Sequence, residues 1–78
     1  MPTVLQDPPY SFVFFSSDLG EPSHIHIKRD RRIAKFWLNP VSVAKNKGFK
    51  ERELSRITRL VVKHHERLLE SWHDYFGS

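Results

Sequence analysis

The sequence predicts an α+β protein in which a small antiparallel sheet of three to four strands precedes a short helix and a long C-terminal helix packed on one sheet face. Two patterns support this fold class. Apolar and polar residues alternate within short segments up to about residue 38, as in strands with one covered face. Apolar residues then recur at intervals of three and four, the period of an amphipathic helix, at Leu54, Ile57, Val61, Leu68, Trp72 and Tyr75.

The predicted sheet, over about residues 3–38, begins with two extended pieces. Residues 3–5 form a short piece that ends before two prolines, because proline cannot donate a ladder hydrogen bond. Residues 10–15 are rich in aromatic side chains and apolar on both alternating faces, which predicts a strand covered on two sides or central in its sheet. The polar residues 16–23 are typical of a loop.

The centre of the predicted sheet is a hairpin of residues 24–28 and 33–38, which turns through the four residues between them. With this even-length turn, the facing pairs are His26–Lys35 and His24–Trp37 on one face, and Ile25–Phe36 and Ile27–Ala34 on the other. We expect the long helix to cover the apolar face. The face with the two histidines is then expected to stay open to solvent or to a partner.

Two helices are predicted after the hairpin. An Asn-Pro pair at positions 39–40 supplies an N-cap and a first helical residue, so a short helix is expected over about residues 40–46, before a left-handed turn at Gly48. A long helix is expected over about residues 50–75, with two glutamates near its positive end. Its last aromatic residues either close the domain's own core or contact a partner, including a second copy in a homodimer; they are Trp72, Tyr75 and Phe76.

Composition narrows the classes of function. The 78 residues make one domain, residues 1–78, and the formal net charge of +4 favours acidic partners such as nucleic acid or an acidic protein. The absence of cysteine excludes disulfides and thiolate metal sites. No apolar run approaches the ~20 residues of a membrane span, and the N-terminus lacks the pattern of a signal peptide. We therefore expect a soluble, cytoplasmic protein that does not act at a membrane.

The histidines His24 and His26 are candidates for acid–base catalysis. Near neutral pH one imidazole can be protonated while the other is free, which is the arrangement needed to cleave a phosphodiester without a metal. Lys35 would stabilise negative charge on the phosphate, and Trp37 would stack on a base. Glu21 would supply a carboxylate at the entrance of the strand. The alternative is a solvated strand face with no catalytic role.

Two other interpretations of these residues stay open. The two histidines would be metal ligands if Asp18, Glu21 or His65 supplied a third, but no such convergence is evident, and neither a metal nor another cofactor is expected. His65 lies within the apolar stripe of the long helix and is expected to be a hydrogen-bonded core residue. A non-catalytic module would bind nucleic acid or an acidic partner through the basic hairpin tip and its indole, namely Lys28, Arg29, Arg31, Arg32 and Trp37. Further basic residues are expected around the helix junction, at Lys45, Lys47, Lys50 and Arg52.

Several segments, taken in order, resemble a known family. They are Gly-Glu-Pro-Ser-His-Ile-His at 20–26, Ala-Lys-Phe-Trp-Leu-Asn-Pro-Val at 34–41, Asn-Lys-Gly-Phe at 46–49, Glu-Leu at 53–54 and Trp-His-Asp-Tyr-Phe at 72–76. Nearly end to end, the chain resembles a bacterial family of small proteins classed as domain of unknown function 4160. The matching positions are Glu21, Pro22, His24, His26, Lys35, Trp37, Pro40, Asn46, Gly48, Glu53 and Trp72. Ser23 and Lys50 depart from the family pattern, in which a second proline and a capping serine are common.

This resemblance implies a genetic context more than a chemistry. Family members are often encoded beside another small uncharacterised domain, in an arrangement that resembles a toxin–antitoxin module. We therefore hypothesise a toxin-like component that acts on RNA through His24 and His26 as a metal-independent ribonuclease, with a small acidic protein as its cognate partner. The alternative is a non-enzymatic, antitoxin-like protein that binds an acidic protein or nucleic acid through the same hairpin face.

Overall fold

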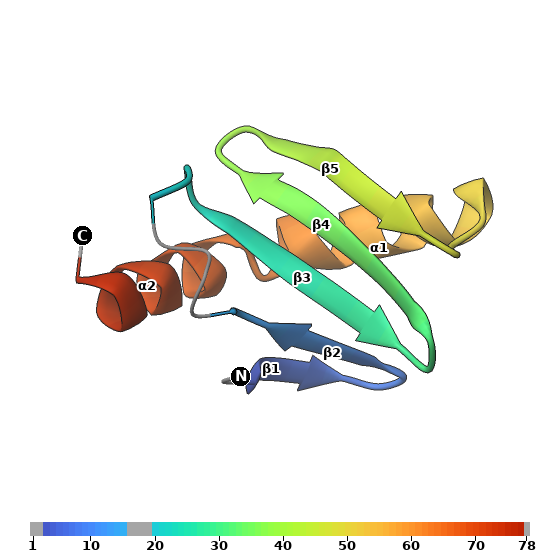
Figure 1. The fold of residues 1–78 in the computed structure, drawn as a ribbon, viewed down its shortest axis with the longest axis horizontal. Helices are drawn as coiled ribbons and strands as arrows, with labels where there is room; N and C mark the ends of the chain where they lie inside the picture. The colour runs from blue at the N-terminus through green and yellow to red at the C-terminus, as the bar shows by residue number, and fades with distance from the viewer. Residues whose placement is uncertain (1–2, 16–19, 78) are drawn as a thin grey trace.

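A five-stranded antiparallel sheet and two helices form the structure, a computed structural model that describes residues 3–15 and 20–77 (Figure 1). The strands follow one another across the sheet in chain order, and the helices pack on one of its faces. The predicted α+β class is confirmed, although the sheet has five strands instead of three or four. The elements are β1 (Thr3–Asp7), β2 (Tyr10–Val13), β3 (His24–Arg29), β4 (Arg32–Leu38), β5 (Val41–Lys47), α1 (Glu51–Lys63) and α2 (His65–Phe76).

The β3–β4 hairpin has the predicted register. All four facing pairs are present, from His24–Trp37 at one end to Ile27–Ala34 near the turn. The turn has two residues, and its first, Asp30, has a positive φ of 55°, a conformation that aspartate tolerates better than most residues. The side chains expected on the apolar face are buried in the core; they are Ile25, Ile27, Ala34 and Phe36.

The prediction of a short helix over residues 40–46 is wrong, because these residues belong to the edge strand β5. Asn39 and Pro40 form the two-residue turn between β4 and β5 instead of a helix start. The β-branched side chains of Val41 and Val43 favour a strand. Pairing with β4 also satisfies backbone groups that so short a helix would leave without partners.

The turn after β5 keeps the glycine conformation expected from the sequence, but it leads from a strand into α1. Gly48 has a φ of 100°, in the left-handed region that favours glycine. The side chain of Asn46 closes this turn: its Nδ2 donates to the carbonyl oxygen of Phe49 at 2.8 Å, and its Oδ1 accepts from the Phe49 amide at 3.1 Å. A Cβ at position 48 would lie 3.0 Å from Cγ of Arg32, so the turn packs closely against β4.

The predicted long helix is divided into α1 and α2 at His64, whose φ of −100° and ψ of 12° are not helical. Nε2 of His64 lies 3.1 Å from Oδ2 of Asp7 at the end of β1. Nε2 of the next residue, His65, donates to the carbonyl oxygen of Leu38 at the end of β4. The break therefore connects the helices to two strands, and the expected hydrogen bond of His65 is confirmed.

One buried apolar cluster joins the sheet to both helices. Ile57 and Val61 of α1 and Leu68 and Trp72 of α2 are buried in it, which confirms most of the predicted helical stripe. The break at His64 does not interrupt this stripe, because both helices pack on the same face of the sheet. Over residues 3–15 and 20–77, neither helix is long and apolar enough to cross a membrane.

The aromatic residues at the end of α2 pack mainly within the chain. The ring centroid of Phe14, just after β2, lies 5.3 Å from that of Trp72 and 5.7 Å from that of Phe76. Tyr75 remains 46% exposed, although its ring centroid is 5.9 Å from that of Phe14. Of the two alternatives left open by the sequence, closure of the chain's own core accounts for Trp72 and Phe76.

Candidate nucleic-acid interface

The helices cover one face of the sheet, and the opposite face carries most of the predicted site residues (Figure 1). We call this second face the polar face. Alternation along each strand places on it every second residue of β3 and β4, and a bulge in β5 adds two lysines. Its members on these three strands are His24, His26, Lys28, Ile33, Lys35, Trp37, Ser42, Lys45 and Lys47.

Basic side chains from three neighbouring strands form a line across the polar face. Strand pairing places His26 opposite Lys35, and Lys35 opposite Lys45 on the next strand. In the adjacent row Lys47 lies opposite Ile33. Like charges directly opposite each other destabilise a sheet, so the sheet's own stability does not explain the pairing of Lys35 with Lys45.

An open pocket of about 200 Å³ lies among these side chains. Apolar groups and cationic groups both contribute to its wall, which is formed by Phe15, His26, Ile33, Ala34, Lys35, Lys45 and Lys47. A phosphate needs cations and hydrogen-bond donors, and an unstacked nucleobase needs a flat apolar surface. The pocket offers both within one small area.

The structure brings together Glu21, Lys35 and Trp37, which the sequence analysis assigned to one site. Nζ of Lys35 lies 2.6 Å from Oε1 of Glu21 and 4.7 Å from the centre of the Trp37 ring. These two contacts hold the Lys35 ammonium in place and partly neutralise it. Lys45 and Lys47 are exposed, and neither has an ion pair among residues 3–15 and 20–77.

His24 is fully buried, which corrects the expectation that the histidine face is open. Its Nδ1 lies 2.9 Å from the carbonyl oxygen of Pro22 and donates to it. The His24 ring centroid is 5.6 Å from that of Trp37 and 5.0 Å from that of Trp72, because α2 reaches beyond this end of the sheet (Figure 1). An imidazole enclosed in this way cannot touch a substrate phosphate, and its placement suits a residue that positions its neighbours.

His26 is the half-buried histidine that lines the pocket. The ring of Phe15 packs edge-on against it with centroids 4.4 Å apart, and the centroid of the His24 ring is 5.3 Å away. Acid–base cleavage by two histidines requires both groups within reach of one phosphodiester. The polar face instead presents one accessible imidazole beside several ammonium groups, an arrangement whose chemistry suits the binding of an anion.

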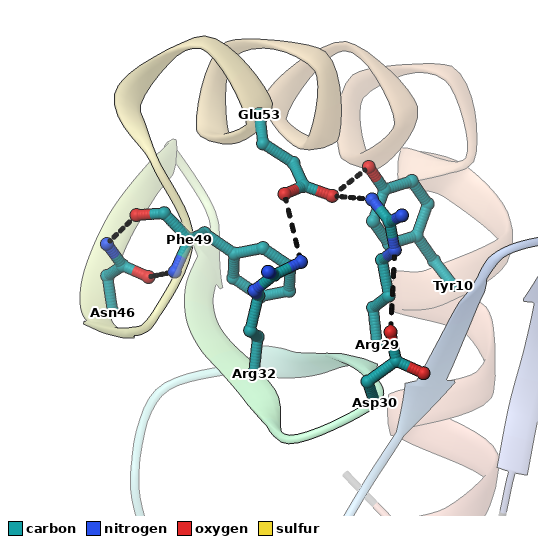
Figure 2. Close-up of polar contacts among 7 residues, drawn as sticks. All are labelled: Tyr10, Arg29, Asp30, Arg32, Asn46, Phe49 and Glu53. Carbon is teal, nitrogen blue, oxygen red and sulfur yellow. Dashed lines mark hydrogen bonds and ion pairs between the residues drawn. The ribbon is translucent and has the colours of Figure 1, made fainter.

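Two arginines predicted to bind nucleic acid belong to an ion-pair network on the helix-covered side of the sheet (Figure 2). Oε2 of Glu53 accepts hydrogen bonds from the Tyr10 hydroxyl at 2.8 Å and from Nη1 of Arg29 at 2.5 Å. Oε1 of Glu53 lies 3.9 Å from Nη1 of Arg32. This network joins the hairpin tip to the first turn of α1.

The network shifts the pKa values of its members. The hydrogen bonds from Tyr10 and Arg29 lower the pKa of the Glu53 carboxyl. Burial, with the hydrogen bond to Glu53 second, raises the pKa of the Tyr10 hydroxyl, and the hydrogen bond to Glu53 raises the pKa of Arg29. The charged forms of Glu53 and Arg29 are thus both favoured, as in a structural ion pair.

One family model covers most of the chain. A domain of unknown function, DUF4160, matches residues 10–73, from the start of β2 to within α2. The chain belongs to this family. No curated protein and no solved structure matches the chain. The matched region contains the hairpin, β5 and the Glu53 network, and with them all the residues assigned to the polar face.

Within the DUF4160 region, the other two predicted contacts lie apart from the Glu53 network. Lys28 is half-buried on the polar face, between Ser11 of β2 and Ile33 of β4. Arg31 is exposed at the hairpin turn. Neither has an ion pair in the described part of the chain.

Lys45 and Lys47 were expected near the helix junction and not on the histidine face of the sheet, because a helix was predicted over most of β5. The signal for a strand was the pair of β-branched residues, Val41 and Val43. Simple alternation would still have put the lysines on the same face as these valines. The bulge where the register shifts between Lys35 and its neighbour moves both lysines to the polar face.

The described residues contain no ligand cluster for the metal site that was considered from the sequence. Among the described residues, no group of three or more His, Asp or Glu side chains could hold a metal ion. The Nε2 of His65 is occupied by its hydrogen bond to Leu38. Asp18, the other candidate third ligand besides Glu21, lies outside the described residues.

Proposed function

We propose that the polar face binds single-stranded RNA, with lysines at the phosphates and apolar side chains against the bases. The observation that carries this proposal is the line of His26, Lys35 and Lys45 across three strands. Glu21 partly neutralises Lys35, but Lys45 beside it has no ion pair among residues 3–15 and 20–77, and neighbouring ammonium groups repel one another unless an anion lies between them. A nucleic-acid backbone supplies such anions at regular intervals.

Single-stranded RNA fits this face better than a duplex, because apolar surface lies between the cations. Phe15 and Ile33 contribute to the pocket, and the half-buried Trp37 lies next to Lys35. Such groups stack on unpaired bases, whereas a duplex keeps its bases stacked inside. His26, at the phosphates, would also be close to the 2′-hydroxyl groups that distinguish RNA from DNA. We expect little sequence preference, since stacking and phosphate contacts carry no base code.

The burial of His24 favours binding over cleavage. General acid–base cleavage of a phosphodiester needs one group to remove a proton and another to supply one, both in contact with the substrate. Only His26 of the two histidines lines the pocket. His24 then acts indirectly, by packing between Trp37 and Trp72 and fixing the end of β3.

The test is a binding titration by fluorescence anisotropy with a labelled single-stranded RNA of about 12 nucleotides, a length within the usual range of such sites. The double variant Lys45→Glu and Lys47→Glu should bind at least about tenfold more weakly than the wild type, because it replaces two phosphate-binding cations by anions. The matched control is Lys63→Glu and Arg67→Glu, which has the same charge change on the helical layer. Equal losses in both double variants would contradict the proposed site.

The same RNA, recovered after incubation, distinguishes binding from cleavage. Intact RNA after prolonged incubation with the wild type is the expected result. Cleavage that is lost in both His24→Asn and His26→Asn variants, with their folding intact by circular dichroism, would instead support the acid–base pair predicted from the sequence. Cleavage that persists in both variants would point to a contaminating nuclease.

A further inference from the structure

A second basic surface runs along the outer side of α1. Arg52, Arg56, Arg59 and Lys63 occur at spacings of four, three and four residues, so they lie on one side of the helix. All four are exposed, on the side of α1 away from the buried Ile57 and Val61. At a rise of 1.5 Å per residue the stripe is about 16 Å long. We call these four residues the α1 stripe.

The charges of the α1 stripe are not neutralised by ion pairs within the described chain. None of the four residues forms an ion pair with any of residues 3–15 and 20–77. Like charges three and four residues apart destabilise a helix, and a solvated helix face usually alternates the two signs for this reason. The exposed side of α2 has that mixed character, with Glu66, Arg67, Glu70, His73 and Asp74.

Three residues of the α1 stripe also line a hollow in the surface. An open hollow of about 250 Å³ is lined by Arg52, Ser55, Arg56 and Arg59. Guanidinium groups bind phosphate in a bidentate manner, and a serine hydroxyl is a common additional donor to phosphate oxygens. Three guanidinium groups and a hydroxyl around one hollow match that chemistry.

We infer that the α1 stripe binds the phosphate backbone of a nucleic-acid duplex. A straight, rigid row of cations complements the regular backbone of a duplex, which presents several phosphates over about 16 Å. The stripe differs from the polar face because it has no aromatic side chain on which an unpaired base could stack. The two layers of the protein then bind different forms of nucleic acid independently.

An acidic protein is the less suitable occupant of the α1 stripe. Stable protein interfaces need a buried apolar centre, and exposed charge pairs add little net affinity. Val62, 58% exposed, is the only large exposed apolar side chain of the described α1. A polyanion, in contrast, binds through release of its counterions and needs no apolar contact.

The experiment measures anisotropy of a labelled blunt RNA duplex of about 16 base pairs, the length that a double-stranded RNA-binding domain spans. We expect the wild type to bind, with log K decreasing against log salt at a slope of about −3.6 if four phosphates are contacted. The double variant Arg56→Glu and Arg59→Glu should bind at least about tenfold more weakly. Arg56→Lys and Arg59→Lys should lose only about two- to threefold, because charge is kept and the bidentate fork is lost.

The polar-face variant Lys45→Glu and Lys47→Glu is the matched control, because it carries the same charge change. It should retain duplex binding within about twofold, while Arg56→Glu and Arg59→Glu should retain single-stranded RNA binding. Duplex binding that is absent in the wild type, or that both double variants weaken equally, would overturn the inference. Polyglutamate that displaces the labelled duplex as effectively as unlabelled duplex does, at the same concentration of negative charge, would also overturn the inference, in favour of an acidic protein. Failure of the single-stranded RNA proposal alone would leave the duplex result intact.

Discussion

Two pairs of basic residues that look alike in the sequence have different partners in the fold. Arg29 and Arg32 face each other at the end of the β3–β4 hairpin, and both guanidinium groups point toward Glu53 of α1 (Figure 2). Lys45 and Lys47 project from β5 onto the polar face, where their cross-strand neighbours are a lysine and an isoleucine. The arginines are therefore neutralised within the protein, whereas the two lysines remain available to an external anion.

The difference arises from the side of the sheet on which each pair projects. Arg29 and Arg32 alternate in step with the core residues of their strands and so point toward the helices, where both remain partly exposed. The first turn of α1 supplies the carboxylate that compensates them. Lys45 and Lys47 project the other way because of the bulge in β5. The number of cations at a hairpin tip thus does not measure its affinity for nucleic acid.

The largest effect on stability is expected from removing the Glu53 carboxylate, which neutralises the arginine pair and has no counterpart beside the lysine pair among the described residues. Glu53→Ala leaves the Tyr10 hydroxyl and the Arg29 guanidinium without their hydrogen-bond acceptor and Arg32 without its ion-pair partner, so the melting temperature should fall clearly below that of the wild type. The control is Glu51→Ala in the same turn, an exposed residue that should lose only a helix-dipole interaction of about 0.3–1 kcal/mol. Equal decreases in melting temperature would contradict the structural role of the network.

The second effect is a dependence of stability on pH. The pKa of Glu53 is lower in the folded protein than its ordinary value of 4.5, because Tyr10 and Arg29 donate hydrogen bonds to the carboxylate. Its contribution to stability is therefore fully present above that ordinary value and is lost as the pH falls through the lower, folded pKa. Urea unfolding of the wild type should show a free energy that decreases below about pH 4.5.

Glu53→Gln isolates this contribution, because glutamine does not titrate while other acidic groups still do. The variant should be less stable than the wild type at neutral pH, and its free energy of unfolding should decrease less steeply over the same acidic range. Parallel curves for the two proteins would mean that Glu53 has an ordinary pKa in the folded state.

Periodic patterns in the sequence were sufficient to predict the register of the hairpin and the buried face of the helices. A period of two and an even-length turn predicted the register from His24–Trp37 to Ile27–Ala34, and all of these pairs are present. Apolar residues at intervals of three and four predicted the buried stripe, which continues from α1 into α2 across the break at His64. These patterns work because the face on which a side chain lies depends only on its position along its own strand or helix.

Features that depend on contacts distant in sequence could not be predicted in this way. The Asn-Pro pair before residue 41 satisfies the rules for a helix start, and only the edge of β4 beside it makes a strand preferable. The burial of His24 depends on Trp72, which lies in the last helix. The ion pair of Arg29 within the fold depends on Glu53. From the sequence, the charge of Glu53 was interpreted only as favourable to the start of a helix.

The smallest effect on stability is expected from neutralising a lysine of the polar face. Lys45→Gln removes the repulsion between Lys45 and Lys35 across β4 and β5, so the free energy of unfolding should stay within about 0.5 kcal/mol of the wild type or rise slightly. The same substitution removes one phosphate contact. The slope of log K against log salt for single-stranded RNA should therefore become shallower by about 0.7.

Arg29→Gln should show the reverse pattern, which makes the two substitutions a matched pair. It removes the charge that faces Glu53, so the protein should melt at a lower temperature, while the salt dependence of RNA binding should not change. If Lys45→Gln instead destabilised the fold and Arg29→Gln weakened RNA binding, the division between internally neutralised and available cations would be wrong. Ion pairs within the fold would then not determine which basic residues of this protein bind nucleic acid.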